Sequence, residues 1–199
     1  MAERYALARA MQPTLIWITP SEKTMAGNNL ATVTTNTMPK SNVTIKADPP
    51  QLIYLAKTIY GEARGQNYES KVAVGWTIRN RVDQKFHGAS TYSQVVTARG
   101  QYDAWMKHDP NYREVQHPGD KKAWQDSLQA ARDVYYGNAA SNPVPGATHY
   151  YSPNSQKALH NQYPGTYPAV PSFITPDAQR VPNPANVDED DFRFYKNVR

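Results

Sequence analysis

The chain has 199 residues, enough for one sizeable hydrophobic core, and it contains no cysteine. A disulfide framework, a thiolate nucleophile and a cysteine metal site are therefore excluded. Lys and Arg number 22 against 17 Asp and Glu, and the resulting net charge of +5 suits an anionic polymer. No dense basic run and no nucleic-acid-binding motif accompany this excess, so we expect no nucleic-acid partner.

Residues 1–48 differ in composition from the rest of the chain. A short apolar run at 15–18 ends at Pro20, and residues 21–46 are rich in Thr, Asn, Ser and Lys. The run is too short for a secretory signal, and no segment approaches the roughly 20 apolar residues that span a membrane. We expect residues 1–48 to be an extended arm or linker that docks on a partner, or else a disordered leader with no role. Residues 49–199 are expected to form one domain.

A single carboxylate, Glu62, follows the first expected helix. The apolar positions of this helix recur at amphipathic spacing after the Pro49–Pro50 pair: Leu52, Leu55, Ala56 and Ile59. Gly61 and Gly65 bracket Glu62 and predict a turn with tight or positive-φ geometry. A carboxyl held against apolar walls ionises less readily, so its pKa rises and it can act as a general acid near neutral pH. The alternative is a helix-end residue that faces water.

Three further helices are expected downstream of Glu62. Their predicted N-caps, in chain order, are Asn67, Ser90 and Asp120. Gly100 and Gly137 are expected to end the second and the third. The buried face of the first should contain Val72, Trp76 and either Ile78 or Asn80. The apolar face of the third should contain Trp124, Leu128, Ala131 and Tyr135.

The remaining segments have little periodicity. Residues 106–119 are rich in His, Asp, Pro and Gly and are predicted to be a polar loop. Residues 149–151 and 191–196 are predicted to be short strands. The Pro-rich span 153–184 between them is expected to be a long irregular loop with a functional role. These segments and the helices together predict an α+β fold that is mainly helical and has a small β element.

The motifs around Glu62 occur in a distinctive order. Tyr60-Gly-Glu-Ala-Arg-Gly65 is followed by 72–76 (Val-Ala-Val-Gly-Trp), 80–82 (Asn-Arg-Val) and 100–105 (Gly-Gln-Tyr-Asp-Ala-Trp). In order and spacing these strings resemble the catalytic domain of the spore-cortex-lytic and cell wall hydrolase family typified by SleB. Weaker similarities stand at 147–153 and 192–196, so the resemblance covers roughly the last three quarters of the chain. It implies a lysozyme-like domain that cleaves bacterial peptidoglycan.

The resemblance implies a mechanism with one carboxyl group, as in lytic transglycosylases, whereas most glycosidases use two. Glu62 would protonate the bond between N-acetylmuramic acid and N-acetylglucosamine. It would then act as base for the sugar's own primary hydroxyl, which leaves an anhydro end. A second carboxylate would convert the enzyme into a hydrolase. Asp103 is the first candidate for that role, and Glu69 and Asp109 are the others.

The resemblance also implies a cleft that binds glycan. Gln101 can donate to and accept from an N-acetyl group or a sugar hydroxyl. Tyr102 and Trp105 are expected to form a stacking wall for sugar rings, although Trp105 could equally belong to the core. The other candidates alternate on the two faces of a predicted strand, of which one is expected to face the cleft: His149, Tyr150 and Tyr151.

No metal and no cofactor are expected. The five histidines lack the i, i+4 spacing of a zinc-binding helix, and the chain has no HExxH motif. Two features depart from the family pattern. Phe192 stands where family members tend to place a histidine, and the span 153–184 is longer than the usual connection.

The expected setting is a bacteriophage enzyme that acts on the wall at the periplasm or cell surface. It would be a lysis enzyme, present in the host cytoplasm before release, or a virion-associated enzyme used at entry. Residues 1–48 would then bind a phage tail protein or another virion protein. The rival hypothesis is a structural virion component or glycan-binding module that keeps the fold without efficient catalysis.

Overall fold

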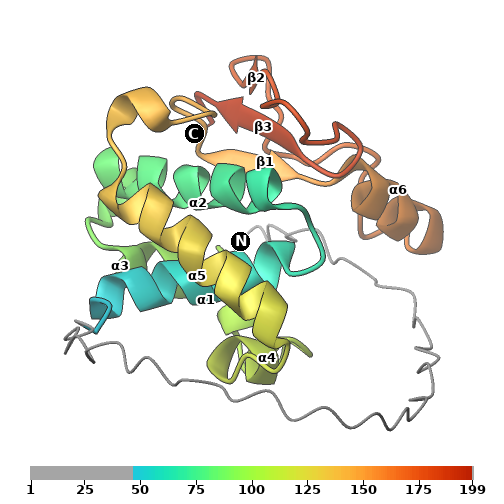
Figure 1. Cartoon of the computed structure of the whole chain (residues 1–199). Coiled ribbons are helices and arrows are strands. Elements are labelled where there is room, and N and C mark those ends of the chain that lie inside the picture. The colour runs from blue at the N-terminus through green and yellow to red at the C-terminus, as the bar shows by residue number, and fades with distance from the viewer. Residues whose placement is uncertain (1–46, 199) are drawn as a thin grey trace, which may run out of the picture. The chain divides into compact units, whose positions relative to one another are not determined.

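The computed structural model describes residues 47–198, so the expectations for the apolar run at 15–18 and for residues 1–46 lie outside the described residues. The described part of the chain contains six α-helices, which are α1 Pro50–Ala63, α2 Tyr68–Asp83, α3 Tyr92–Thr97, α4 Tyr112–Gln116, α5 Lys121–Tyr136 and α6 Pro153–Gln162. It also contains three strands, which are β1 His149–Tyr151, β2 Gln179–Val181 and β3 Arg193–Lys196 (Figure 1). The predicted mainly helical α+β fold is confirmed.

Helices α1, α2 and α5 pack against one another, and α2 also contacts β1 (Figure 1). Gly75 lies at the point where the three helices meet. A Cβ at this position would stand 2.9 Å from the side chains of both Ile59 and Val134, so only glycine allows the approach. The prediction of a single buried face for α2 is wrong, because its buried residues surround the helix: Ser70, Lys71, Ala73, Val74, Gly75, Trp76, Thr77, Ile78, Asn80 and Arg81.

The helix starts follow the predicted cap signals with one exception. Pro50 is the first residue of α1. The side-chain oxygens of two predicted caps accept backbone N–H groups three residues on: Asn67 from Ser70 at 2.9 Å and Asp120 from Ala123 at 3.0 Å. Helix α3 is capped by Thr91 and not by Ser90, because Thr91 has the extended backbone and its hydroxyl accepts the N–H of Gln94.

Glu62 lies inside α1, in its last turn, and not in the turn that follows. Gly65 lies in the tight turn after the helix, where the Gln66 N–H donates to the Ala63 carbonyl at 3.0 Å, and neither Gly61 nor Gly65 has a positive φ. Gly61 is needed for packing instead, since a Cβ there would stand 2.7 Å from Val115 Cγ2 on α4. The glycine before Glu62 therefore brings α4 close against α1.

Two segments that were expected to be irregular contain regular structure. Helix α4 lies within 106–119, and its one buried apolar residue, Val115, gave no periodic signal. Helix α6 and strand β2 lie within 153–184. Ser152 caps α6 by accepting the Ser155 N–H at 3.2 Å, and the next residue is a proline at the first helical position. A Ser–Pro pair is compatible with both a turn and a helix start, so the sequence did not distinguish them.

The buried stripe of α5 is rotated from the predicted one. Small side chains form its centre, which lets α1 and α2 approach closely: Ala123, Ser127, Ala130, Ala131 and Val134. Of the predicted positions only Ala131 is fully buried, while Trp124, Leu128 and Tyr135 are partly buried and flank the core.

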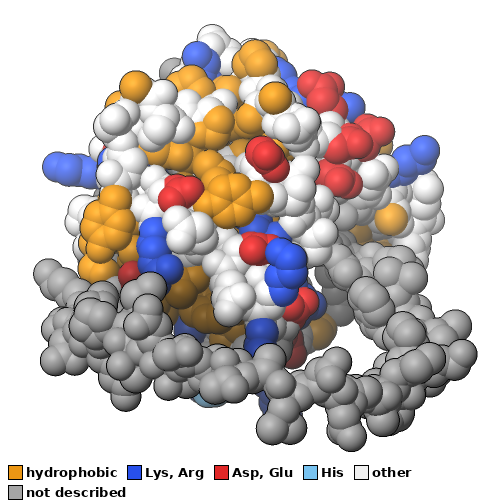
Figure 2. Space-filling model, viewed as in Figure 1, with side chains coloured by type: hydrophobic (Ala, Val, Ile, Leu, Met, Phe, Trp, Pro, Cys, Tyr) orange, Lys and Arg blue, Asp and Glu red, His pale blue; other side chains and the backbone are white. Residues whose placement is uncertain are grey.

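Figure 2 shows that the face seen in Figure 1 carries interspersed basic and acidic side chains around apolar patches.

The strands form one antiparallel sheet in the order β1-β3-β2. Successive side chains of a strand point to opposite faces, so the register divides the residues of the sheet into two sets. Tyr150, Phe194 and Val181 belong to the hydrophobic core shared with the helices. Tyr151 and Tyr195 pack on the other face with Phe173 in a second, smaller cluster. The strand thus directs Tyr150 towards the helices.

Candidate active site

The carboxyl group of Glu62 is partly buried and is held at one of its two oxygens. The Tyr150 hydroxyl donates a hydrogen bond to Glu62 Oε2 at 2.9 Å, across 88 positions of sequence. In the part of the chain that the structure describes, Glu62 Oε1 has no hydrogen-bond partner. One oxygen is therefore fixed by the protein, and the other remains available to a ligand.

The surroundings of Glu62 raise its pKa to about 7. Burial is the largest cause, because it disfavours the charged carboxylate, and the nearby charges of Asp103 and Asp109 act in the same direction. The hydrogen bond from Tyr150 and the charge of Arg81 oppose the shift. Near neutral pH a large fraction of Glu62 therefore carries a proton, which a general acid requires.

Arg81 is a buried cation beside this carboxyl. Only 4% of its surface is exposed, and its guanidinium lies 5.2 Å from the ring centroids of both Phe86 and Tyr102. Its Nη1 donates to Gln101 Oε1 at 2.8 Å, and its Nε donates to the Thr148 carbonyl. Within residues 47–198 no carboxylate forms a salt bridge with it. The sequence gives no sign that Arg81 belongs to the site, because its burial depends on the central position of α2.

Tyr102 and Trp105 are less open than a stacking wall requires. Tyr102 is fully buried, and its hydroxyl has no hydrogen-bond partner in the described residues. Trp105 is partly buried; its ring stacks on Tyr54 at 5.3 Å, and its Nε1 donates to Thr58 Oγ1 at 2.9 Å. Tyr102 therefore contributes a buried hydroxyl near Glu62, while Trp105 forms an aromatic pair further back along α1.

Asp103, the candidate second carboxylate, lies within electrostatic range of Glu62. Burial raises its pKa, the charge of Asp109 raises it further, and that of His108 lowers it. Asp103 therefore lies close enough to Glu62 for its charge to act on that carboxyl.

The three candidates on β1 are not equivalent. Only Tyr150 reaches Glu62, while His149 and Tyr151 share the opposite face and pack against Phe173. Burial, together with the charges of Arg81 and His87, lowers the pKa of His149 to about 3, so the ring is neutral at physiological pH. Of the candidates, Tyr150 alone is hydrogen-bonded to Glu62 in the described residues, while Tyr102 and Asp103 lie within its electrostatic range. Gln101 is linked to Glu62 through Arg81, and His149 and Tyr151 lie on the opposite face of β1.

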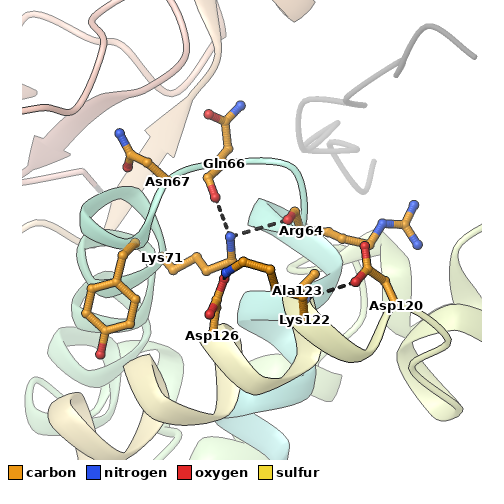
Figure 3. A pocket seen from close by; sticks show the side chains of 9 residues that line it. Arg64, Gln66, Asn67, Lys71, Asp120, Lys122, Ala123 and Asp126 are labelled. Atoms are coloured by element: carbon orange, nitrogen blue, oxygen red, sulfur yellow. Dashed lines mark hydrogen bonds and ion pairs between the residues drawn. The ribbon is translucent and has the colours of Figure 1, made fainter. Parts of the chain in front are cut away.

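The turn behind Glu62 is held by a buried lysine. Lys71 is 2% exposed, and its ammonium donates to the carbonyl oxygens of Arg64 and Gln66. Figure 3 shows both bonds at the base of a groove beside the start of α5, and Glu62 is not among the residues that line this groove. Lys71 therefore satisfies backbone acceptors at the end of α1, directly after Glu62.

Replacing Lys71 by Met should destabilise the domain by about 1.5–3 kcal/mol, because two buried carbonyl groups would lose a charged donor. Urea denaturation followed by circular dichroism measures the change in the free energy of unfolding. Lys122→Met is the matched control, since Lys122 lines the same groove but is exposed. If both variants unfold at the urea concentration that unfolds the parent, Lys71 does not hold this turn.

Two further observations concern residues 47–198. No group of three or more His, Asp or Glu side chains there is arranged to hold a metal ion. No helix among these residues is both long and apolar enough to cross a membrane.

Comparison with known proteins first defines the class of fold. The chain is similar to the solved structure titled as the catalytic domain of the germination-specific lytic transglycosylase SleB from Bacillus anthracis. The TM-score is 0.50 at 18% sequence identity, and the match covers 77% of this chain and 100% of that one. The predicted SleB-like, lysozyme-like fold is therefore confirmed. No curated protein matches the chain significantly in sequence.

The family follows from sequence. Residues 65–169, slightly more than half of the chain, match the model of the cell wall hydrolase family, and the chain belongs to this family. It is thus a peptidoglycan-degrading enzyme, as the sequence analysis expected. The matched segment begins three residues after Glu62, so it includes Arg81, Gln101 and Tyr150 but not the candidate acid itself.

Proposed function

We propose that the enzyme cleaves the glycan strand between N-acetylmuramic acid and N-acetylglucosamine as a lytic transglycosylase, with Glu62 as its single acid and base. One observation carries the proposal: a partly buried carboxyl with a pKa raised to about 7, bound by Tyr150 at Oε2 and free at Oε1. The similarity to a structure titled as a lytic transglycosylase supports the same reaction type.

In the first step, protonated Glu62 gives its proton to the glycosidic oxygen, and the bond from this oxygen to the anomeric carbon breaks. The N-acetylglucosamine side leaves as an alcohol, and positive charge develops on the muramic ring. The Glu62 carboxylate then accepts the proton of that ring's primary hydroxyl, whose oxygen attacks the anomeric carbon. An intramolecular ether forms, Glu62 is protonated again, and no water is consumed. Tyr150 holds the carboxyl in place through both steps.

Hydrolysis with a second carboxylate is the competing reaction. Asp103 is the residue that would serve it, because its charge lies within range of Glu62. The similarity to a structure titled as a lytic transglycosylase favours the reaction with a single carboxyl group. The lytic transglycosylase is therefore the better supported reaction.

The products distinguish the two reactions. Digestion of purified peptidoglycan should release muropeptides whose muramic ends carry an anhydro bond, because the attacking hydroxyl belongs to the same sugar. Mass spectrometry detects these ends as products that lack one water. Products with the mass of a free reducing end would instead establish a hydrolase, and Asp103→Asn would then be the first variant to test.

We also propose that residues 1–48 form an arm that is not needed for glycan cleavage. The support is their composition, together with the pairing of Asp48 with Arg132 on α5 at 3.0 and 2.6 Å. Asp48, the last residue of this segment, is therefore attached to the domain, and the residues before it are the ones that glycan cleavage should not need.

A chain that starts at Lys46 should therefore fold and cleave isolated wall at close to the full-length rate. A chain that starts at Pro49 lacks Asp48 and should unfold at a lower urea concentration. Turbidity assays on wall suspensions measure the rates. If the chain that starts at Lys46 is unfolded or cleaves slowly, the arm belongs to the catalytic domain.

An arm ahead of a wall-degrading domain suits an enzyme carried on, or released by, a bacteriophage, and we propose this setting for the chain. The arm would bind a tail protein or another virion protein. Mass spectrometry of purified virions tests the virion-borne form, which requires the chain to be present in mature particles.

A further inference from the structure

The side-chain amide of Gln101 is bound on one side only. Its oxygen Oε1 accepts a hydrogen bond from Arg81 Nη1 at 2.8 Å. In the described part of the chain its nitrogen Nε2 has no hydrogen-bond partner, and the residue is partly exposed. A guanidinium carries donors and no acceptor, so Arg81 can bind the oxygen of this amide but not its NH2 group. The NH2 group is therefore the end of the Gln101 amide that remains free.

Arg81 cannot readily turn away from Gln101. It is buried between the rings of Phe86 and Tyr102, and a second hydrogen bond ties its Nε to the Thr148 carbonyl at the start of β1. The orientation of the Gln101 amide is thus imposed by the fold and does not depend on the ligand.

Gln101 is linked to Glu62 through Arg81 and through its neighbour Tyr102. Gln101 immediately precedes Tyr102, and the charges of Glu62 and Arg81 both act on the Tyr102 hydroxyl. Arg81 in turn acts on Glu62. We take a glycan whose scissile bond lies at Glu62 to extend from there to the NH2 group of Gln101.

We propose that Gln101 is a specificity-determining residue whose free NH2 group donates to the glycan and thereby selects the carbonyl oxygen of an N-acetyl group. This inference rests on the proposed function in one respect, namely that glycan binds at Glu62. A sugar hydroxyl can donate or accept, so it would not be discriminated. A de-N-acetylated amino sugar carries an ammonium with donors only, and it would meet Gln101 donor to donor. The site should therefore reject de-N-acetylated glycan.

Binding to the full chain carrying Glu62→Gln tests this selection without turnover. The probes are an N-acetylglucosamine tetramer and the matching glucosamine tetramer, each measured by isothermal titration calorimetry. The Glu62→Gln chain, which is the parent of the variants below, should prefer the acetylated tetramer. Gln101→Met should weaken binding of that tetramer by about tenfold and leave the glucosamine tetramer nearly unchanged, because only the acetylated ligand loses a hydrogen bond.

Gln101→Glu provides the opposite test. One carboxylate oxygen can still accept from Arg81, while the other places an acceptor where the NH2 group was. The preference should therefore shift towards the glucosamine tetramer. Gln125→Met, at an exposed position of α5, is the matched control and should leave the preference as in the parent.

The inference is overturned if Gln101→Met weakens both tetramers by the same factor, if it changes neither, or if neither tetramer binds the parent. These outcomes are separate from failure of the proposed function. If the unmodified chain does not cleave peptidoglycan, the proposed reaction fails, but a preference for the acetylated tetramer that depends on Gln101 would remain.

Discussion

Glu62→Gln should lower peptidoglycan cleavage by about 10²–10⁴-fold or more while leaving the domain folded. The amide has nearly the shape of the carboxyl and can still accept the hydrogen bond from Tyr150, but it cannot give up and retake a proton. Release of soluble muropeptides from purified wall measures the rate, and circular dichroism measures the fold. Loss of the rate with an unchanged spectrum is the expected result.

Asp103→Asn is the matched control, because it makes the same carboxyl-to-amide change in a residue whose charge reaches Glu62. A lytic transglycosylase should tolerate it with a change of a few-fold. If Glu62→Gln keeps activity within a few-fold of the parent, Glu62 is not the acid. If Asp103→Asn is as damaging as Glu62→Gln, two carboxylates share the chemistry.

The cleavage rate should fall about tenfold for each pH unit above about 7, because only protonated Glu62 can donate and its pKa is raised to about 7. Tyr150→Phe removes the hydrogen bond that lowers this pKa, so the alkaline limb should move to higher pH while the maximal rate falls. Initial rates over a pH series locate the limb.

Tyr151→Phe is the control for this shift, since it removes a tyrosine hydroxyl from the opposite face of β1 and should leave the midpoint of the limb in place.

The raised pKa of Glu62 also makes the stability of the folded protein depend on pH. The pKa of Glu62 in the folded protein lies above its ordinary value of 4.5, so the stabilising contribution of its protonation is complete below about pH 4.5 and is lost as the pH rises through about 7. A limb near pH 4.5 in the unmodified enzyme would contradict the assignment of Glu62.

The sequence by itself determined the local features of this protein. Pro50, Asn67 and Asp120 were identified as helix starts because a cap acts within about one turn of its own residue. The string around Glu62 placed a carboxyl at the end of an apolar helix. The period-two alternation of β1 established that Tyr150 faces away from its two neighbours. In each case the interacting groups lie a few positions apart.

The tertiary structure alone decided which of these residues meet. The bond between Tyr150 and Glu62 spans 88 positions, so the strand pattern could not show which face of β1 points to the acid. The burial of Arg81 and Tyr102 required α2 to lie at the centre of the domain, and a helix with a mixed polar sequence gives no periodic sign of that position. The raised pKa of Glu62 and the fixed amide of Gln101 both depend on this arrangement, because burial and long-range contacts arise only when the helices and the sheet pack together.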